Sequence, residues 1–536
     1  MRLSSLYRMS LIASACLLTS SGLNAGVAED VTNFKKLDAK QKEDLVEGLS
    51  RKSLKKLKPE ELLKVQKACF ELSKQLIGSN GKGGLKTVKD PSAAAVLKVA
   101  GDYLDNMPVE QTPAHPAAGA IFGEVPAKAP RVTQSVEINP WVVRWHATGL
   151  YAAPGEVVTL KFPKEWVGKG LKVQLSGHTD KISTKKKLQR LPASPARAFE
   201  VNATEVKISG AFGGAIYINT GNERRKDGKF QVAISNAVKA PYYVLGSTSL
   251  EKWKNELKNA PAPYAEFVTP RIALSFPSAW IRDLEDPKAL LEYWDEVVKL
   301  HDELGGLGGV RYGPERVNVD VQISVGLFHA GYPTQGPQAQ CRGVVDLAKL
   351  KTKGNWGWFH EMGHESQRRP DKAWGWNNPY TFDGSIEVTV NLFSSHAMDR
   401  LKMKDRGGWS WTASAYEVAK RADKVLKEGK SYPEMGAGDK LAMYLQLRDA
   451  FGWDPIGKVL ASYSQDQDKR PGILPKLNQE KRDVFMVRMS RQVERNLAPF
   501  MEEVWGIKLG KDAKNMVKDL PVWIPEGFEK FTSTEN

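Results

Sequence analysis

The residues from 356 to 365 read Trp-Gly-Trp-Phe-His-Glu-Met-Gly-His-Glu, with histidines at positions 360 and 364. Two residues four apart lie on the same face of a helix, one turn above the other, so both imidazoles can reach one metal ion. Glu361 follows the first histidine, where its carboxylate can contact a metal-bound water without ligating the metal. This spacing predicts a zinc site in which His360 and His364 are ligands and Glu361 is the general base of a hydrolysis.

The residues around this pair are typical of a helix that is buried along one side. Trp356, Trp358 and Phe359 lie just before or within the motif and supply an apolar face. Gly363 costs about 1 kcal/mol inside a helix, so its presence indicates close packing or the close approach of a ligand. The competing interpretation is an amphipathic helix whose two histidines share a face by chance.

A catalytic zinc site needs a third protein ligand and keeps a fourth position open. The best candidate is Glu387, in the segment Asp-Gly-Ser-Ile-Glu-Val-Thr-Val-Asn-Leu-Phe-Ser-Ser from residue 383 to residue 395. We expect a second helix here, beginning near Asp383 as its N-cap. Glu387 and Asn391 share one face of that helix. Taken alone, a surface glutamate is the competing interpretation of Glu387.

Three further side chains are candidates for supporting roles at the site. Asp383 and Asn391 stand one helical turn either side of Glu387 and could orient the metal ligands, although capping is the simpler role for Asp383. Tyr380, in the loop between the two helices, could stabilise the oxyanion that forms beside the metal.

Other ionisable residues are expected to serve elsewhere. His396 is nine residues past Glu387, about half a rotation away on a helix, so it should point off the site. Glu365 should face solvent or a basic neighbour. The remaining histidines lack ligand spacing and are interpreted as structural: His115, His146, His178, His301 and His329.

The chain of 536 residues is too long for one core, and its patterns predict an α+β multidomain protein. Residues 26–107 carry leucines at helical spacing among lysines, and we expect a basic helical spacer or adaptor. Residues 108–133 are rich in Pro and Ala and are interpreted as a linker. Short alternating segments in residues 134–250 predict a β-sandwich. Residues 251–405 mix strands and helices around the zinc motif, and residues 406–536 are predicted to form a helical C-terminal subdomain.

The first 25 residues are typical of an export signal. Arg2 and Arg8 give a positive start, an apolar stretch follows, and Ala25 ends a small-residue cleavage site. We therefore expect a secreted or periplasmic protein without a transmembrane segment, and lipid anchoring at Cys16 is the less favoured alternative. The two remaining cysteines, Cys69 and Cys341, could pair, but they do not make a disulfide framework.

The formal net charge is +16, and loss of the two signal-peptide arginines leaves +14. Such a charge favours anionic glycans or a cell surface as partners, or it is simply a well-solvated basic surface. No nucleic-acid motif accompanies it, so nucleic acid is not an expected partner. The basic run at residues 51–58 is interpreted as a solvated helix face, and a second basic run, Lys185-Lys186-Lys187, falls in a loop between strands.

Four segments of the chain resemble the enhancin-like, mucin-degrading metallopeptidases (peptidase family M sixty), which are gluzincins. They are residues 148–156 and 212–217 in the predicted sandwich, the zinc helix at 360–367, and the third-ligand helix at 387–393. The likeness covers roughly residues 135 to 525 and leaves out the basic helical region. It implies one zinc ion held by two histidines and a downstream glutamate, and cleavage of glycoproteins outside the cell.

Two other functions compete with a peptidase. A glycan- or surface-binding protein could use the same fold without catalysis, although the presence of His360, Glu361 and His364 argues for an enzyme. An amidase acting on cell-wall peptides is the second alternative, because the ligand set alone does not distinguish one carbonyl substrate from another.

Overall fold

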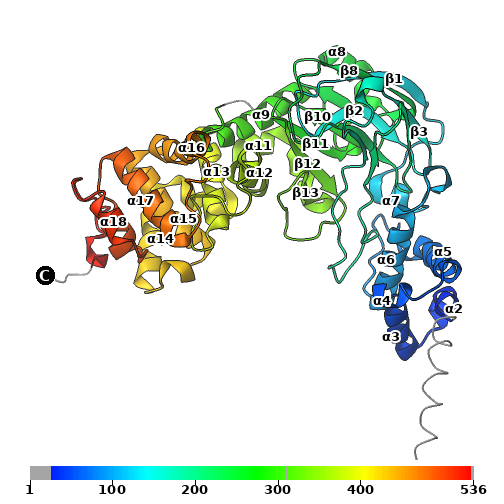
Figure 1. Ribbon diagram of the computed structural model, residues 1–536, viewed down its shortest axis with the longest axis horizontal. Helices are drawn as coiled ribbons and strands as arrows, with labels where there is room; N and C mark the ends of the chain where they lie inside the picture. The colour runs from blue at the N-terminus through cyan, green and yellow to red at the C-terminus, as the bar shows by residue number, and fades with distance from the viewer. Residues whose placement is uncertain (1–25, 309–310, 533–536) are drawn as a thin grey trace, which may run out of the picture.

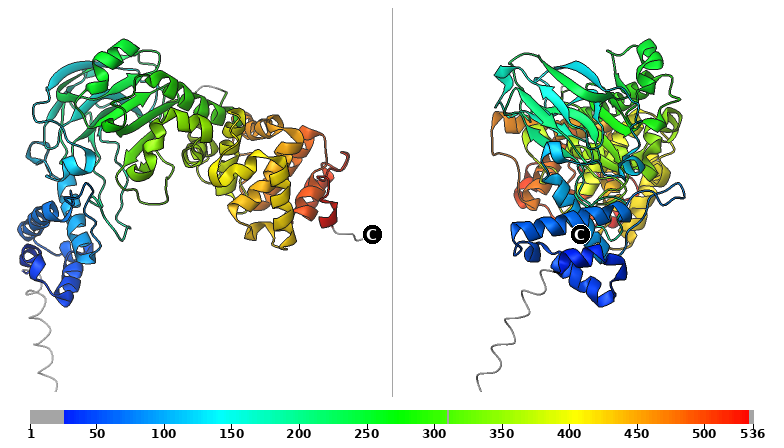
Figure 2. Two further views of the ribbon diagram at one scale, coloured as in Figure 1. Left: turned by 180° about the vertical axis from the view of Figure 1, so that it is seen from behind. Right: turned by 90° about the vertical axis from the view of Figure 1, so that its right-hand side faces the viewer.

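In the computed structural model, which describes residues 26–308 and 311–532, the chain forms an arch (Figure 1). The N-terminal helices form one end of the arch, the C-terminal helices form the other, and two β-sheets lie between them (Figures 1 and 2). The α+β multidomain class predicted from the sequence is confirmed. The predicted signal peptide, residues 1–25, lies outside the described residues.

The region 26–107 is helical, as the leucine spacing predicts. Several of its helices start at favourable sequences: the Asp38 side chain accepts a hydrogen bond from the Gln41 amide, and Pro59 and Pro91 occupy first turns, where the missing N–H costs little. The helices are α2 (Val27–Thr32), α3 (Ala39–Gly48), α4 (Arg51–Leu54), α5 (Pro59–Leu76) and α6 (Pro91–Asp105).

The stretch interpreted as a linker, residues 108–133, is folded against the sandwich instead of spanning open space. It contains η2 (Val109–Gln111) and α7 (Ala118–Phe122). Ile121 and Phe122 are buried in a core that the N-terminal helices share with Tyr151 and Phe212 of the sandwich. Burial of these apolar side chains holds the Pro-rich segment against the sandwich. The N-terminal helical region is therefore docked on the sandwich.

Residues 132–239 form an antiparallel eight-stranded sheet with the order β5-β4-β7-β2-β8-β3-β6, in which β1 also pairs with β8. Strands such as β6 alternate exposed and buried side chains, the pattern of a sheet with one face on a core. The two halves of the sheet close on one apolar core, which confirms the predicted sandwich. Its strands are β1 (Val132–Ile138), β2 (Trp145–Ala152), β3 (Val158–Lys161), β4 (Lys172–Leu175), β5 (Arg197–Glu200), β6 (Glu205–Ile208), β7 (Gly214–Asn219) and β8 (Phe230–Lys239).

A second, five-stranded sheet follows in the order β13-β12-β11-β10-β9. β10 and β11 are antiparallel, and the other neighbours run parallel. Every residue of β11 and β12 is buried, as expected for strands that are covered on both faces. The elements are β9 (Tyr242–Val244), α8 (Leu250–Asn255), β10 (Tyr264–Val268), β11 (Ile272–Pro277), α9 (Pro287–Leu304), β12 (Glu315–Asp320), β13 (Thr334–Pro337), α10 (Gln338–Cys341) and α11 (Leu347–Lys353).

Two helices that carry the predicted ligands, α12 (Trp356–Arg368) and α13 (Ile386–Arg400), pack closely together. A Cβ atom at Gly363 would lie 3.1 Å from Phe393 Cβ and 3.2 Å from Val390 Cγ2, so the glycine permits the approach that the sequence indicated. The predicted start of the second helix at Asp383 is wrong. The helix begins at Ile386, because Asp383 and Gly384 have φ values of 49° and 66°, in the left-handed region.

The C-terminal part is predominantly helical, as predicted. Tyr444 and Leu445 share a core with Val388 and Leu392, so α13 is anchored in the C-terminal helices as well as on α12. The elements are η8 (Gly407–Ala413), α14 (Ala415–Lys427), α15 (Ala437–Phe451), α16 (Trp453–Lys469), α17 (Asn478–Val493), the π-helical turn η10 (Phe500–Val504) and α18 (Lys511–Asn515).

Cys69 in α5 and Cys341 in α10 are buried in separate cores, and both are free thiols, so they do not pair. Among the described residues, no helix combines the length and the apolar character needed to cross a bilayer.

Candidate metal centre

The orientation of α12 follows from its apolar face. The Asn355 side chain caps the helix by accepting a hydrogen bond from the Trp358 amide at 3.1 Å. Trp358, Phe359 and Met362 are fully buried in the core that α9 and the five-stranded sheet share. With that face fixed inward, the polar side chains at positions 360, 361 and 364 are turned away from the core.

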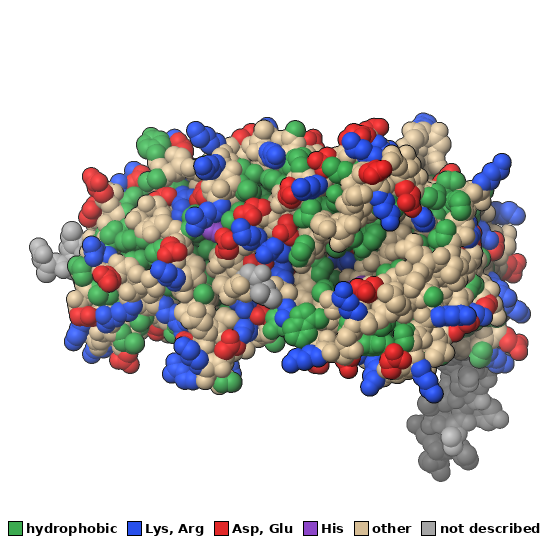
Figure 3. All heavy atoms as spheres, turned by 90° about the horizontal axis from the view of Figure 1, so that it is seen from above, with side chains coloured by type: hydrophobic (Ala, Val, Ile, Leu, Met, Phe, Trp, Pro, Cys, Tyr) green, Lys and Arg blue, Asp and Glu red, His purple; other side chains and the backbone are tan. Residues whose placement is uncertain are grey.

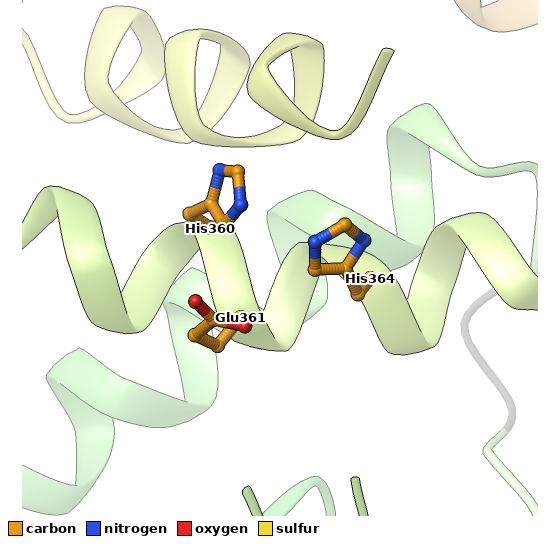
Figure 4. A group of neighbouring side chains, drawn as sticks. All are labelled: His360, Glu361 and His364. Carbon is orange, nitrogen blue, oxygen red and sulfur yellow. The ribbon is translucent and has the colours of Figure 1, made fainter. Parts of the chain in front are cut away.

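The two predicted histidine ligands converge with the predicted third ligand. The ligand atoms of His360, Glu361 and His364 lie within 4.8 Å of one another, and both imidazoles project from the same side of α12 (Figure 4). From α13, Glu387 Oε2 lies 2.9 Å from His360 Nε2 and 3.6 Å from His364 Nε2. Hydrogen bonds from the two imidazoles hold the pKa of the Glu387 carboxyl well below its ordinary value. Two imidazoles and a carboxylate therefore gather around one point, which suits a metal ion.

The Nδ1 atom of each histidine is hydrogen-bonded to an amide side chain. His360 Nδ1 donates to Asn391 Oδ1 at 2.8 Å, and His364 Nδ1 donates to Gln367 Oε1 at 2.9 Å. Asn391 also accepts from the Trp356 indole N–H at 3.2 Å. Such bonds leave each Nε2 free to bind a metal and set the ring orientation. Asn391 thus has the orienting contact that the sequence suggested. Gln367 was not among the predicted supporting residues, although it follows His364 by three residues on the same helix, a spacing that could have identified it.

Glu361 is half-buried beside the two histidines and faces the segment that precedes β13. Burial raises the pKa of its carboxyl, against the opposing effect of the neighbouring imidazoles and of the Ala330 backbone N–H. The adjacent His329 donates to Asp180 Oδ2 at 2.9 Å, and that carboxylate belongs to a loop of the sandwich. His329 was interpreted as structural from the sequence. Its contacts join a sandwich loop to the rim of the site, a long-range link that no local spacing signals.

Two of the predicted supporting residues are not brought into the site. Tyr380 is 2% exposed, lies in the core of the C-terminal helices and donates its hydroxyl to the Gln367 carbonyl at 3.2 Å. That hydroxyl is therefore committed to the backbone and is not available to an oxyanion. Asp383 lies 3.7 Å from Arg482, so its carboxylate faces the C-terminal helices and not the ligands.

The expectations for His396 and Glu365 agree with the structure. His396 Nδ1 donates to the Leu300 carbonyl at 3.0 Å, away from the ligand cluster. Glu365 is buried, and it faces basic neighbours: Arg368 at 3.0 Å and Arg144 of the sandwich at 4.0 Å. Burial and the nearby Glu315 carboxylate raise the pKa of Glu365 to about 7.

Aromatic side chains flank the ligand cluster on two sides. The indole of Trp376 is 53% exposed, and its ring centroid lies 5.2 Å from that of His364. Beyond His360, the rings of Trp356 and Trp409 stack in parallel at 4.4 Å. Partly exposed aromatic faces beside a site provide apolar surface for a bound substrate.

The comparisons with known proteins agree with this geometry. Residues 236–506 match the family described as Peptidase M60, enhancin and enhancin-like, and residues 127–235 match the N-terminal domain of M60-like peptidases. A TRPM8 channel-associated factor homolog from Xenopus laevis is 33% identical over 407 residues, which cover 76% of this chain and 43% of that protein. The chain thus spans less than half the length of the curated relatives that it matches.

Solved structures share the fold at low sequence identity. A functionally unknown conserved protein from Bacillus anthracis, solved as a mutant, superposes with a TM-score of 0.58 at 21% identity, covering 76% of this chain and 82% of that one. IMPa from Pseudomonas aeruginosa, solved in complex with an O-glycopeptide, gives a TM-score of 0.53 at 15% identity, covering 86% of this chain and 62% of that one.

The match to the family model and the shared fold place the chain in a class of peptidase-related proteins, and its zinc-motif helix carries side chains that could hold a metal ion. More narrowly, the chain belongs to the peptidase M60 family of enhancin and enhancin-like proteins. The resemblance inferred from the motifs is therefore confirmed.

Proposed function

We propose that the protein is an exported, zinc-dependent metallopeptidase that hydrolyses peptide bonds in glycoproteins. The observation that carries the proposal is the convergence of Glu387 Oε2 on the Nε2 atoms of His360 and His364, at 2.9 and 3.6 Å. Two histidines and a glutamate are the ligand set of several catalytic zinc sites, in which the fourth position is left for water or substrate.

Each residue has a distinct task in this proposal. His360, His364 and Glu387 hold one zinc ion, and Asn391 and Gln367 keep the imidazoles oriented. When bound, the metal supplies a Lewis acid that acidifies a water molecule and polarises the scissile carbonyl. Glu361 takes the water proton and passes it to the leaving amine, and its raised pKa makes it a better proton acceptor.

The substrate and the location of the protein are also proposals. The first 25 residues support export to the periplasm or the exterior, where glycoproteins are accessible. A structural neighbour was solved with an O-glycopeptide, which supports a glycosylated substrate for this chain. The exposed indole of Trp376 beside His364 offers an aromatic surface that suits sugar rings as well as apolar side chains.

A binding protein without catalysis is the second candidate, because the curated relatives are named as channel-associated factors and not as enzymes. The cell-wall amidase alternative is supported only by the positive net charge. The retained carboxylate of Glu361, beside an intact ligand cluster, favours an enzyme over the binding protein.

Metal removal and replacement test the proposal. Wild-type protein, stripped with a chelator and reloaded with zinc, should recover about one zinc per chain and cleavage of an O-glycosylated protein. Glu387→Gln should bind the metal more weakly and lose activity in proportion. Cleavage that persists in the stripped protein would exclude the metal mechanism. Zinc binding without cleavage of glycoprotein or cell-wall peptides would favour the binding protein.

A further inference from the structure

A basic groove of about 430 Å³ lies between a sandwich loop and the loop that follows β12. We call it the lysine groove. Its polar lining consists of Lys185, Lys186, Lys187, Gln189, Gln322 and Gln340. No acidic side chain lines it among the residues that the structure describes. The groove therefore presents three ammonium groups and three amides, a set that suits an anion with several oxygen atoms.

The three lysines have no acidic partner within the described ranges, since none of the ion pairs found there involves them. Two carboxylates of the neighbouring loops, Asp320 and Asp180, are already engaged. Asp320 is buried and bonded to Arg190, at 3.0 and 3.1 Å, and Asp180 accepts from His329 and from the Ser324 amide. By contrast, acidic and basic side chains are interspersed on the convex face of the arch (Figure 3).

The groove is held in a fixed position beside the metal centre. The Gln322 side chain donates to the Lys187 carbonyl at 2.7 Å and accepts from the Gln189 amide at 2.9 Å, which joins the two loops. Leu327, which lines the groove, is only three residues from Ala330, the residue that faces Glu361. Three residues span at most about 11 Å, so the groove starts within reach of a substrate that occupies the site.

The shape of the molecule distinguishes between possible anionic partners. Leu327 is 66% exposed, and an exposed aliphatic residue beside lysines would ordinarily suggest a lipid surface. However, β13, whose last residue Pro337 lines the groove, lies on the concave side of the arch, between the N-terminal and C-terminal helices (Figures 1 and 2). A flat bilayer would meet the two ends of the arch first, whereas an extended polymer can lie along the concave side.

We propose that the lysine groove binds carboxylated or sulfated sugars on the glycan chains of the substrate, and so selects acidic glycoproteins. This inference rests on the proposed function for its substrate, but the binding event itself does not require catalysis. The sugar acid groups would pair with Lys185, Lys186 and Lys187, while the side chains of Gln189 and Gln340 offer hydrogen bonds to neighbouring hydroxyls.

Binding is tested in the Glu361→Gln background, so that failure of the peptidase proposal does not affect the result. The probe is chondroitin sulfate, compared with the same polymer after chemical desulfation, by titration calorimetry. Replacement of Lys185, Lys186 and Lys187 together by Gln should raise Kd for the sulfated polymer roughly tenfold, since three exposed charge contacts are lost. The control replaces Lys52, Lys55 and Lys56, which are also exposed, and should leave Kd within about twofold.

Several outcomes would overturn the proposal. An equal loss of binding in the control variant would show a general charge effect. Equal affinity for polyglutamate would indicate an acidic-peptide site, and groove-dependent binding to phosphatidylserine vesicles would indicate a membrane surface. If the wild type cleaves glycoprotein, the groove variant should raise KM for the sialylated form only, with kcat unchanged. A KM that rises equally for the desialylated form would also contradict the proposal.

Discussion

Replacement of Asn391 by leucine tests how much the orientation of His360 contributes to the metal centre. The amide makes three contacts: it accepts from His360 Nδ1 at 2.8 Å and from the Trp356 indole at 3.2 Å, and it donates to the Glu387 carbonyl at 2.7 Å. Leucine has a similar volume and can make none of these bonds. His360 then loses the partner that fixes its tautomer and ring plane.

The expected loss of metal affinity is about 10- to 100-fold, or about 1.4 to 2.8 kcal/mol, the usual effect of removing such an orienting partner. The free energy of unfolding of the metal-free protein should also fall, by about 1 to 3 kcal/mol, because the Trp356 N–H is left without its acceptor. The two effects are separable, since one is measured by zinc titration against a competing chelator and the other by urea unfolding without metal.

Asn318→Leu is the matched control. Asn318 is also buried and donates to His178 Nδ1 at 3.2 Å and to Gln335 Oε1 at 3.0 Å, but it does not contact the proposed ligands. It should lower stability by a similar amount and leave zinc affinity unchanged. Equal zinc affinity in Asn391→Leu and wild type would refute the orienting role, and equal losses in both variants would show that affinity reports only general stability.

Three further predictions concern packing, the rim of the site and pH. Gly363→Ala should lower the free energy of unfolding by about 1 kcal/mol and weaken zinc binding, because the new methyl group presses on Phe393 at 3.1 Å and Val390 at 3.2 Å. This overpacking, about 2 kcal/mol, outweighs the roughly 1 kcal/mol that alanine gains over glycine in a helix, and unchanged or higher values in urea and zinc titrations would contradict it. Asp180→Asn removes the charged partner of His329 and should lower kcat/KM about tenfold at unchanged zinc content; a loss of zinc instead would point to a wider structural change. Burial lowers the pKa of His115 to about 4, against an unfolded value near 6.5, so the unfolded chain binds the proton more readily and His115 should cost up to about 3 kcal/mol of stability as pH drops from 6.5 to 4. Burial also lowers the pKa of His146, His301 and His396, so His115→Gln should make the fall of the free energy of unfolding, measured by urea unfolding, shallower without abolishing it; an unchanged pH dependence would contradict this.

The parts of the site that lie on one helix were predictable from the sequence. His360, Glu361 and His364 were predicted from their spacing on one helix. Glu387 was chosen as a glutamate on a separate helix downstream, and Asn391 because it lies one turn from Glu387 on the same face. The spacing within each helix is local geometry, which the periodicity of a helix fixes, whereas the pairing of Glu387 with the two histidines of another helix came from the resemblance to the gluzincins.

The errors arose where backbone conformation or distant packing decides the outcome. Asp383 was expected to cap α13, but its left-handed φ delays the helix to Ile386. Tyr380 was expected at the site, but the C-terminal helices bury it. The link from Asp180 to His329 joins residues 149 positions apart, so no spacing rule could have found it.

The domain organisation was likewise predictable where local sequence patterns decide it, and not where packing between distant residues decides it. Alternation of apolar residues identified the sandwich, and leucine spacing identified the helical regions at both ends. The Pro/Ala-rich stretch 108–133 was interpreted as a linker, and its composition does not show that Ile121 and Phe122 have a core to enter. Burial of that kind depends on residues far away in the chain.

The central claim is that His360, His364 and Glu387 hold a metal ion, and that Glu361 is the base that accepts a proton from the attacking water. The most direct test measures zinc content and glycoprotein cleavage side by side for the mature wild type and for Glu361→Gln. The account predicts about one zinc per chain in both proteins, cleavage by the wild type, and a loss of activity in the variant of several orders of magnitude. A wild-type protein that holds no zinc after zinc-replete purification, or a Glu361→Gln variant that cleaves as fast as the wild type, would contradict it.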